Sequence, residues 1–269
     1  MKRLEIYSLA TVRIYCLAVP NKEKIQRATG FLLKHNNKTY LITNDHVVSG
    51  LGHGDRKILS ETGAIPGWLE INLILPSVRG FSAGNSTGVD FFNITMPLYK
   101  DPEACLEPEW ISHPQLGHRV DVVALDIQPA IENAGINPPV TLSFSQEESV
   151  FRPMDSVFVV GFPLDSDKSP NPFPIYKSAF IASEPDVFGE RPYVLIDGKT
   201  RSGMSGSPVI LKKGFEMNDE KDGYTFKSGE IELIGVYSGR ESESKSTFEA
   251  ELGLMWPYKA AVEPIFESL

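Results

Sequence analysis

Short apolar runs, separated by turn-forming residues, dominate the pattern of hydrophobic and polar positions along the chain. The runs are rich in β-branched and aromatic residues, and glycine, proline, asparagine or aspartate stands between them. Short runs with turn signals are typical of an all-β sandwich or barrel, and about ten to twelve strands are expected. The predicted strands include residues 11–19, 30–34, 40–43, 69–75, 120–127, 156–161, 193–196, 208–211, 233–237 and 252–256.

Long helical periodicity is absent from the pattern. Residues 257–269 predict only a short C-terminal helix, because Pro257 suits a helix start and Pro264 limits its length. Polar stretches at 49–67, 79–111 and 216–229 are predicted surface insertions. The predicted organisation is one unit, 1–269, with an N-terminal half 1–128, a connector 129–149 and a C-terminal half 150–269.

The composition is that of an ordinary globular protein. The chain has 269 residues, of which 41% are hydrophobic and 23% charged. A net charge of -9 argues against nucleic acid and against an anionic membrane surface as partners. Glu5 and Arg13 interrupt the apolar N-terminus, and no small-residue cleavage site follows, so we expect a strand there and a cytoplasmic protein.

Cysteine and histidine usage gives no sign of a metal centre. The two cysteines, Cys16 and Cys105, are expected to be free thiols, and a single disulfide stays open as the alternative. The five histidines are scattered, without zinc-ligand spacing. Neither a metal nor another cofactor is expected.

Residues 203–208 read Gly-Met-Ser-Gly-Ser-Pro and carry the most specific chemical signal. Glycines at these positions allow a tight turn that presents the Ser205 hydroxyl. The N–H groups of Gly203 and Ser205 can then point into one small space, as an oxyanion hole requires. The alternative is an ordinary surface turn, which glycine, serine and proline also favour.

A nucleophilic serine needs a base and a group that orients the base. His46 is the candidate base, because the polar pair Asn44-Asp45 turns the chain at the end of a predicted strand. A purely structural histidine is the alternative. The other histidines lie in loop-like segments without this context: His35, His53, His113 and His118.

Asp121 is the candidate orienting acid. It opens an apolar strand, where a buried carboxylate needs a firm hydrogen-bond partner such as an imidazole N–H. The alternative is an aspartate that caps a turn at the start of a strand. Asp90 and Asp126 are weaker rivals, because neither leads into so regular an apolar run.

The order His46, Asp121, Ser205 along the chain resembles that of the chymotrypsin-like serine proteases. The resemblance is closest to bacterial trypsin-like peptidases, which include the high-temperature-requirement proteases. It covers most of the chain except the insertions. The segments that carry it are 28–33, 43–48, 121–125, 155–163 and 233–239.

This resemblance implies an all-β fold of two six-stranded antiparallel β-barrels with a short C-terminal helix, and a catalytic site between the barrels. It implies a serine endopeptidase that cleaves proteins or peptides without a cofactor. Ser205 is then the nucleophile, His46 the general base and Asp121 the acid that orients it. The N–H groups of Gly203 and Ser205 form the implied oxyanion hole.

The chain also departs from the family pattern. Met204 stands where digestive members carry an aspartate that pairs with a newly cut N-terminus, so activation by that ion pair is not expected. Ser207 replaces a glycine two residues after the serine. Two cysteines cannot form the family's disulfides, and no PDZ-like domain is expected after the protease unit.

The resemblance implies a specificity pocket whose wall is formed by the segment before the serine and by the strand that contains Ser238, Gly239 and Arg240. Cations in these segments predict a basic wall, which disfavours Lys or Arg before the scissile bond and favours an acidic or small side chain. The alternative is that the cations reach solvent and the pocket is apolar. The cations are Lys199, Arg201 and Arg240, and the other candidate substrate-binding residues are Ser238, Gly239 and Gly253.

Two other functions use the same residues. A catalytically silent or partner-activated binding module keeps the motifs without turnover of its own, and an esterase differs only in its substrate. A fluorophosphonate probe separates an active enzyme from a silent module, because only an activated serine reacts readily.

Overall fold

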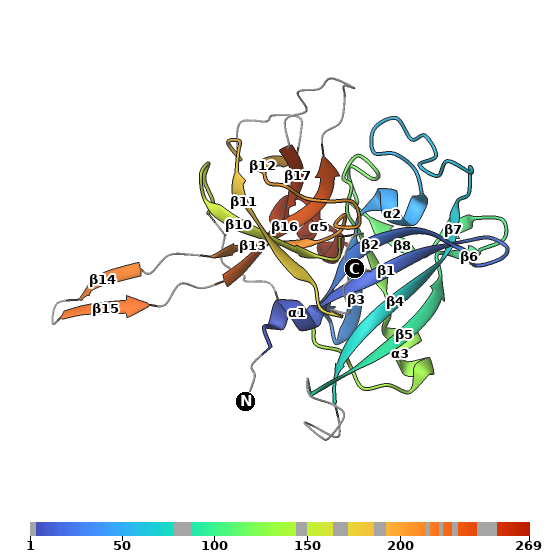
Figure 1. Cartoon of the computed structure of the whole chain (residues 1–269), viewed down its shortest axis with the longest axis horizontal. Coiled ribbons are helices and arrows are strands. Elements are labelled where there is room, and N and C mark those ends of the chain that lie inside the picture. Colours follow the sequence, from blue (N-terminus) through green and yellow to red (C-terminus); the bar gives the residue numbers. More distant parts are fainter. Residues whose placement is uncertain are drawn as a thin grey trace.

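Two β-structured parts make up the computed structural model of the chain, a seven-stranded antiparallel sheet and a closed six-stranded barrel (Figure 1). The N-terminal half of the sequence forms the sheet, and the C-terminal half forms the barrel. The structure describes residues 4–77, 88–143, 150–163, 172–185, 192–212, 216–220, 223–227, 231–240 and 252–269.

The sheet has the strand order β5-β4-β1-β2-β3-β9-β8. Along β1, the side chains of Val12, Ile14 and Cys16 are buried, whereas the alternate residues Arg13 and Tyr15 are partly exposed. This period of two gives the strand one face in the core and one face toward solvent. The strands are β1 Thr11–Ala18, β2 Lys24–His35, β3 Lys38–Thr43, β4 Pro66–Pro76, β5 Val89–Pro97, β8 Trp110–Ser112 and β9 Val123–Asp126.

The barrel closes in the order β10-β11-β12-β17-β16-β13. Its interior is apolar, with Val157, Val159, Ile196 and Val209 fully buried. Closure gives each of these strands a neighbour on both sides, so none of them is an edge strand. The strands are β10 Ser156–Gly161, β11 Ile175–Ile181, β12 Val194–Asp197, β13 Pro208–Lys212, β16 Ile231–Arg240 and β17 Leu252–Pro257.

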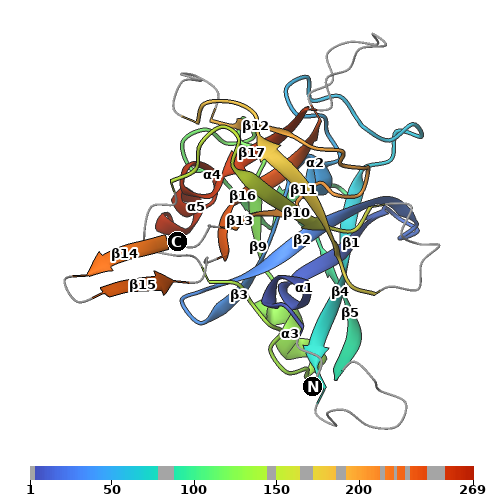
Figure 2. The same cartoon turned by 60° about the vertical axis from the view of Figure 1, so that its left-hand side comes forward.

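Two hairpins extend from these parts. β6 Tyr99–Asp101 pairs with β7 Leu106–Pro108 beside the sheet. β14 Glu216–Glu220 pairs with β15 Gly223–Lys227 and projects away from the barrel (Figures 1 and 2). The second hairpin lies within the surface insertion predicted for residues 216–229.

The sheet and the barrel share one buried apolar cluster. Phe31 and Ile42 of the sheet belong to it together with Val160 and Val236 of the barrel. The C-terminal helices add further buried side chains to the same cluster, so the two parts are packed into one body. The helices are α1 Ile6–Ala10, α2 Asp45–Ser49, α3 Gln128–Ala134, α4 Tyr258–Ala261 and α5 Glu263–Glu267.

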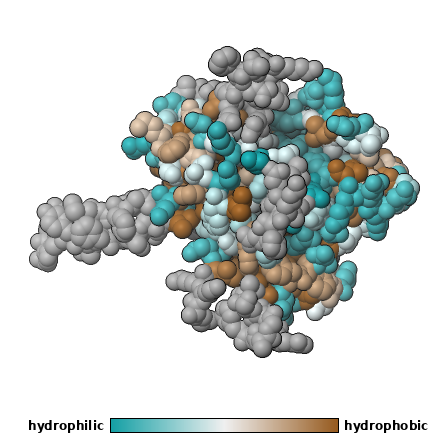
Figure 3. Space-filling view, viewed as in Figure 1, coloured by the Kyte–Doolittle hydropathy of each residue, from teal (hydrophilic) through white to brown (hydrophobic). Residues whose placement is uncertain are grey.

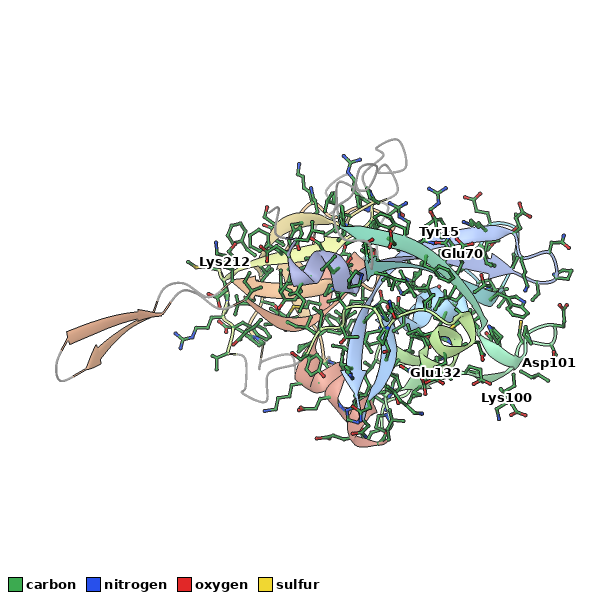
Figure 4. The ribbon with its side chains drawn as sticks, turned by 90° about the horizontal axis from the view of Figure 1, so that it is seen from below. Tyr15, Glu70, Lys100, Asp101, Glu132 and Lys212 are labelled. Atoms are coloured by element: carbon green, nitrogen blue, oxygen red, sulfur yellow. The ribbon has the colours of Figure 1, made fainter. Side chains whose placement is uncertain are left out.

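The outer face of the sheet carries polar contacts between neighbouring strands. Tyr15 of β1 lies opposite Glu70 of β4, and Figure 4 shows the two side by side. The Lys24 ammonium donates to Glu70 Oε1 at 2.8 Å and lies 3.7 Å from the centroid of the Tyr15 ring. Exposed ion pairs of this kind contribute little to stability.

Apolar residues also reach the surface and gather low on the face seen in Figure 3.

The all-β prediction is confirmed as a mostly β chain with one closed six-stranded barrel and a second large antiparallel sheet. The predicted N-terminal six-stranded barrel differs from the observed sheet, which has seven strands and no pairing between its end strands in the described residues. The prediction of a surface insertion was wrong for residues 88–111, which supply β5 and β8, while residues 79–87 lie outside the described ones. The division at residues 128 and 150 stays a prediction.

The reason for this error lies in the position of β5. It is an edge strand, and its Phe91, Phe92 and Asn93 are exposed. An edge strand with an exposed stretch lacks the continuous apolar pattern of a buried strand. The sequence of this region therefore has the composition of a loop.

Both cysteines are free, Cys16 being buried and Cys105 half-buried. Within the described ranges, no helix is long and apolar enough to cross a membrane. The same residues contain no group of three or more His, Cys, Asp or Glu side chains that is arranged to hold a metal ion.

Candidate active site

His46 and Asp121 form the centre of a buried polar network. β3 ends at Thr43, and α2 begins two residues later, which places His46 in its first turn. The Asp121 carboxylate binds this histidine twice, since Oδ2 lies 2.7 Å from the ring Nδ1 and Oδ1 accepts the His46 backbone N–H at 2.9 Å. The Asn44 amide donates to the Asp121 carbonyl at 2.6 Å, so the two segments are joined by three hydrogen bonds.

Burial and charge set the ionisation of this pair. Burial by itself raises the pKa of Asp121, but the His46 charge and the hydrogen bonds outweigh it, so that the pKa lies below its ordinary value. Burial by itself lowers the pKa of His46, and the Asp121 charge and hydrogen bond outweigh it in the other direction, so that the pKa is raised. The arrangement therefore favours a carboxylate anion beside a basic imidazole.

Ser238, from the barrel strand β16, completes the environment of Asp121. Its hydroxyl donates to Asp121 Oδ2, the same oxygen that faces the histidine ring. The Ser238 side chain is buried. The carboxylate that orients His46 is therefore itself held by a residue of the other β part.

Ser205 is the second residue of a tight turn, 204–207, that directly follows another, 201–204. The Met204 N–H donates to the Arg201 carbonyl at 3.2 Å, and the Ser207 N–H donates to the Met204 carbonyl at 3.0 Å. Gly203 has a φ of 91°, the positive value that a type II turn requires at its third position. Ser205 is half-buried.

Thr29 of β2 ties this loop to the sheet. Its backbone N–H donates to the Ser205 carbonyl at 2.9 Å, and its hydroxyl donates to the Gly203 carbonyl at 2.8 Å. The Thr43 hydroxyl, three residues before His46, donates to the Thr29 carbonyl at 2.9 Å. Thr29 therefore joins the serine loop to the end of β3, three residues before the histidine.

Two backbone donors of the serine loop are left without acceptors. The N–H groups of Gly203 and Ser205 make no hydrogen bond with any described residue. The Ser205 hydroxyl also makes none in the described part of the chain, including none with the His46 ring. Catalytic hydrogen bonds are often long before substrate binds, so this geometry is compatible with a nucleophile and a base.

The predicted substrate-binding residues occupy different environments. Gly239 lies close to the serine, since a Cβ built on it would stand 3.9 Å from Ser205 Oγ. Lys199 and Arg201 are exposed, and the side chain of Arg240 lies outside the described ones. The basic-wall hypothesis stays a prediction.

Tyr237 is a neighbour of the predicted pocket that the sequence alone does not single out. A Cβ built on Gly253 would stand only 2.5 Å from Tyr237 Cε2. The Tyr237 hydroxyl and the Thr200 hydroxyl are hydrogen-bonded to each other. Thr29 was missed in the same way, because a threonine inside a strand gives no sequence signal of a loop-anchoring role.

The remaining histidines and rival acids have other contacts. His113 is buried, and its Nδ1 accepts the Leu116 N–H at 3.1 Å. The His35 ring lies 4.9 Å from the Phe266 ring. Asp126 pairs with an exposed lysine on the surface, and Asp90 is exposed. None of these residues contacts Ser205 or His46 by a hydrogen bond in the residues that the structure describes.

Comparison with known proteins gives one family match. The model of the trypsin-like peptidase domain family matches residues 28–215, a span that includes His46, Asp121 and Ser205. The chain is similar to the active form of the Rv3671c protease from M. tuberculosis, with a TM-score of 0.47 and 19% identity over 96% of this chain and 82% of that one. Deg5 gives a TM-score of 0.47 and 14% identity over 94% of this chain and 85% of that one. No curated protein matches the chain.

Proposed function

The chain belongs to the trypsin-like peptidase domain family, and from that premise we propose that it is a serine endopeptidase with Ser205 as its nucleophile. The observation that carries this proposal is the buried His46–Asp121 pair, linked by 2.7 and 2.9 Å hydrogen bonds and joined through Thr29 to the serine loop. The substrates are proteins or peptides, as the family implies.

The first half of the reaction forms an acyl-enzyme. Ser205 Oγ attacks the scissile carbonyl carbon while His46 Nε2 accepts the hydroxyl proton. The tetrahedral intermediate then collapses, the C–N bond breaks, and the imidazolium gives the proton to the leaving amine. Water next attacks the ester with His46 again as the base, which releases the acid and restores Ser205.

Asp121 acts on the histidine and does not accept the transferred proton. Its Oδ2 accepts the Nδ1 proton of His46, which leaves Nε2 as the basic nitrogen. The buried carboxylate also stabilises the imidazolium that forms during each proton transfer. Ser238 supports this role because its hydroxyl binds the same carboxylate oxygen.

The two unpaired backbone donors support the proposed oxyanion hole. The N–H groups of Gly203 and Ser205 make no hydrogen bond with described residues, so they are available for the oxygen of the tetrahedral intermediate. Backbone donors held by a turn need little reorganisation during the reaction. The Thr29 hydroxyl supports the same turn through the Gly203 carbonyl.

Reaction with a fluorophosphonate probe tests the proposal directly. The wild-type protein is expected to be labelled at Ser205 and to cleave an unfolded protein substrate, and Ser205→Ala is expected to do neither. Ser202→Ala is the matched control, because Ser202 is an exposed serine of the same loop. Labelling that persists in Ser205→Ala contradicts the assignment of the nucleophile.

A partner-activated or silent binding module is the second candidate function. It is favoured by one observation, the absence of a hydrogen bond between Ser205 and His46, both of which are described. Such a protein binds peptides at the same site but is not labelled by the probe on its own. Tight peptide binding without labelling in the purified wild type therefore favours this function over the endopeptidase.

A further inference from the structure

The end of β16 passes the nucleophile with part of its backbone unpaired to either neighbouring strand. β13 pairs with β16 as far as Val236, which lies opposite Pro208, and the Tyr237 backbone bonds Gly206 and Ser207 just before β13. The pairing with β17 shifts register between Tyr237 and Arg240, so the residues between them have no register partner in β17. Gly239, one of these residues, lies near the nucleophile, since a Cβ built on it would stand 3.9 Å from Ser205 Oγ. A substrate that adds a strand here presents its scissile bond to the serine.

Side chains along β16 point alternately to its two faces, and this alternation determines which residue of β16 meets the substrate side chain before the scissile bond. Ser238 points toward Asp121, and Tyr237, its neighbour, points into the barrel, where it is only 2% exposed. The Tyr237 ring lies against Gly253 of β17. Its hydroxyl reaches Thr200, which is buried in the segment that leads to the serine. The ring therefore spans from β16 to the loop before Ser205.

We propose that Tyr237 fills the specificity pocket beside Ser205 and restricts the residue before the scissile bond to small side chains, such as those of alanine and serine. This inference rests on the proposed endopeptidase function. A large side chain in the same space has to displace a buried aromatic ring and break the hydrogen bond with Thr200. Gly253 is consistent with this packing, because a Cβ there would already overlap the ring.

The surroundings of the ring separate this proposal from the basic-wall hypothesis. The neighbours of Tyr237 in its buried cluster are apolar, and Met204, Ile196 and Met255 belong to it. The nearby cations Lys199 and Arg201 are exposed. The selectivity proposed here arises from the volume that Tyr237 occupies, and not from charge.

Cleavage of a peptide library by wild type, Tyr237→Val and Tyr237→Phe tests the proposal. The wild type is expected to cleave after small residues at least about 100-fold better than after phenylalanine, since even one methylene changes such ratios by about 10- to 200-fold. Tyr237→Val is expected to reverse much of this preference. Tyr237→Phe keeps the ring and loses only the hydroxyl, so it is expected to retain the wild-type preference.

Probe labelling distinguishes a wrong pocket inference from a wrong proposed function. Because Tyr237→Val leaves a cavity, the cleavage profile of Tyr237→Leu, which fills more of the space, is measured as well. Fluorophosphonate labelling reports whether each variant has an active serine. Labelled wild type that prefers large aromatic or basic residues overturns the pocket inference and leaves the endopeptidase intact. The pocket inference is also overturned if Tyr237→Val and Tyr237→Leu are labelled by the probe but keep the wild-type cleavage preference. Wild type that resists the probe overturns the proposed function and this inference with it.

Discussion

The backbone N–H of Thr29 donates a 2.9 Å hydrogen bond to the carbonyl of Ser205, and this contact joins the sheet to the barrel at the candidate nucleophile. The Thr29 hydroxyl adds two further bonds, as a donor to the Gly203 carbonyl at 2.8 Å and as an acceptor from the Phe162 N–H at 3.0 Å. One threonine of β2 therefore fixes the loop that the proposed chemistry needs. Through Thr29, the serine loop and Phe162, which are far apart in the sequence, are hydrogen-bonded to the same residue of the sheet.

Replacement of this threonine by valine is predicted to weaken both stability and catalysis. Thr29→Val keeps the shape but leaves the Gly203 carbonyl and the Phe162 N–H without their partner. Unsatisfied buried groups cost about 1–3 kcal/mol each, so urea denaturation is expected to show a loss of that order, with a lower kcat. Thr11→Val is the control, because the buried Thr11 hydroxyl has no partner in the described residues, and this change is expected to be neutral or stabilising. Equal losses in both variants contradict the anchoring role.

Gly206 is predicted to tolerate no side chain. Its φ is +84°, and a Cβ there would overlap the Thr29 carbonyl oxygen and the Thr43 hydroxyl. Gly206→Ala is therefore expected to lose more stability than Gly54→Ala, which has a φ of +92° but open space around the position of its Cβ. The control change is expected to cost only the backbone strain of about 1–2 kcal/mol. Thermal unfolding of the two variants measures the difference, and equal shifts contradict the proposed overlap.

The three proposed catalytic side chains are predicted to act as a unit. Ser205→Ala and His46→Ala are each expected to lower kcat by at least about 10⁴-fold, and the double variant is expected to be little worse. The reason is that either change removes the same proton transfer between Ser205 and His46. Steady-state kinetics on one peptide substrate measures this, and losses that multiply in the double variant contradict the unit.

The sequence points to the proposed catalytic residues more directly than to the residues that hold them in place. His46 and Ser205 stand in short motifs whose residue types the proposed serine chemistry requires, so both can be predicted from the sequence. Ser238 and Tyr237 are neighbours on one strand, and their roles depend on which side of β16 faces Asp121. Strand alternation shows that they point to opposite sides, but not which partner each one meets.

The same limit applies to the fold. Strands buried on one face, such as β1 Thr11–Ala18, follow the apolar alternation closely. β5 Val89–Pro97 forms because β4 offers a long partner in register, from Trp68 opposite Pro97 to Pro76 opposite Val89. Pairing with a neighbour contributes backbone hydrogen bonds that no local sequence pattern reports.

The pH dependence of kcat/KM is predicted to report His46. Catalysis needs the neutral imidazole, so activity is expected to fall as the pH drops through the pKa of His46, with a midpoint above the ordinary value of 6.5. Ser238→Ala removes a donor from the Asp121 carboxylate, which then interacts more strongly with the imidazolium, so the midpoint is expected to move to higher pH. Ser8→Ala is the control, because that hydroxyl bonds Tyr176 instead, and no change of midpoint is expected. A midpoint that is the same in all three proteins contradicts the role of Ser238.

The N-terminal segment is predicted to support the fold and not to restrain activity. α1 Ile6–Ala10 contacts the barrel, since the Tyr7 hydroxyl donates to the Ile231 carbonyl at 3.1 Å and the Ser8 and Tyr176 hydroxyls are 2.8 Å apart. Met204 is fully buried and carries no charge for a new α-amino group. Removal of residues 1–10 is therefore expected to lower the free energy of unfolding by roughly 3–5 kcal/mol, the cost of losing a buried aromatic side chain, without raising kcat.

The variant Tyr7→Phe separates the contribution of the buried Tyr7 ring from that of its hydrogen bond. Tyr7→Phe keeps the buried ring and loses only the hydrogen bond to Ile231, so its expected loss is about 1 kcal/mol, much smaller than that of the truncation. Urea denaturation and turnover of one peptide substrate are measured on the full chain, the truncated chain and this variant. Intact protein that is inert and becomes active when the first ten residues are removed contradicts the prediction, because α1 is then an inhibitory segment. A truncated chain as stable as the full one contradicts the supporting role, since the contacts of Tyr7 and Ser8 then contribute nothing measurable.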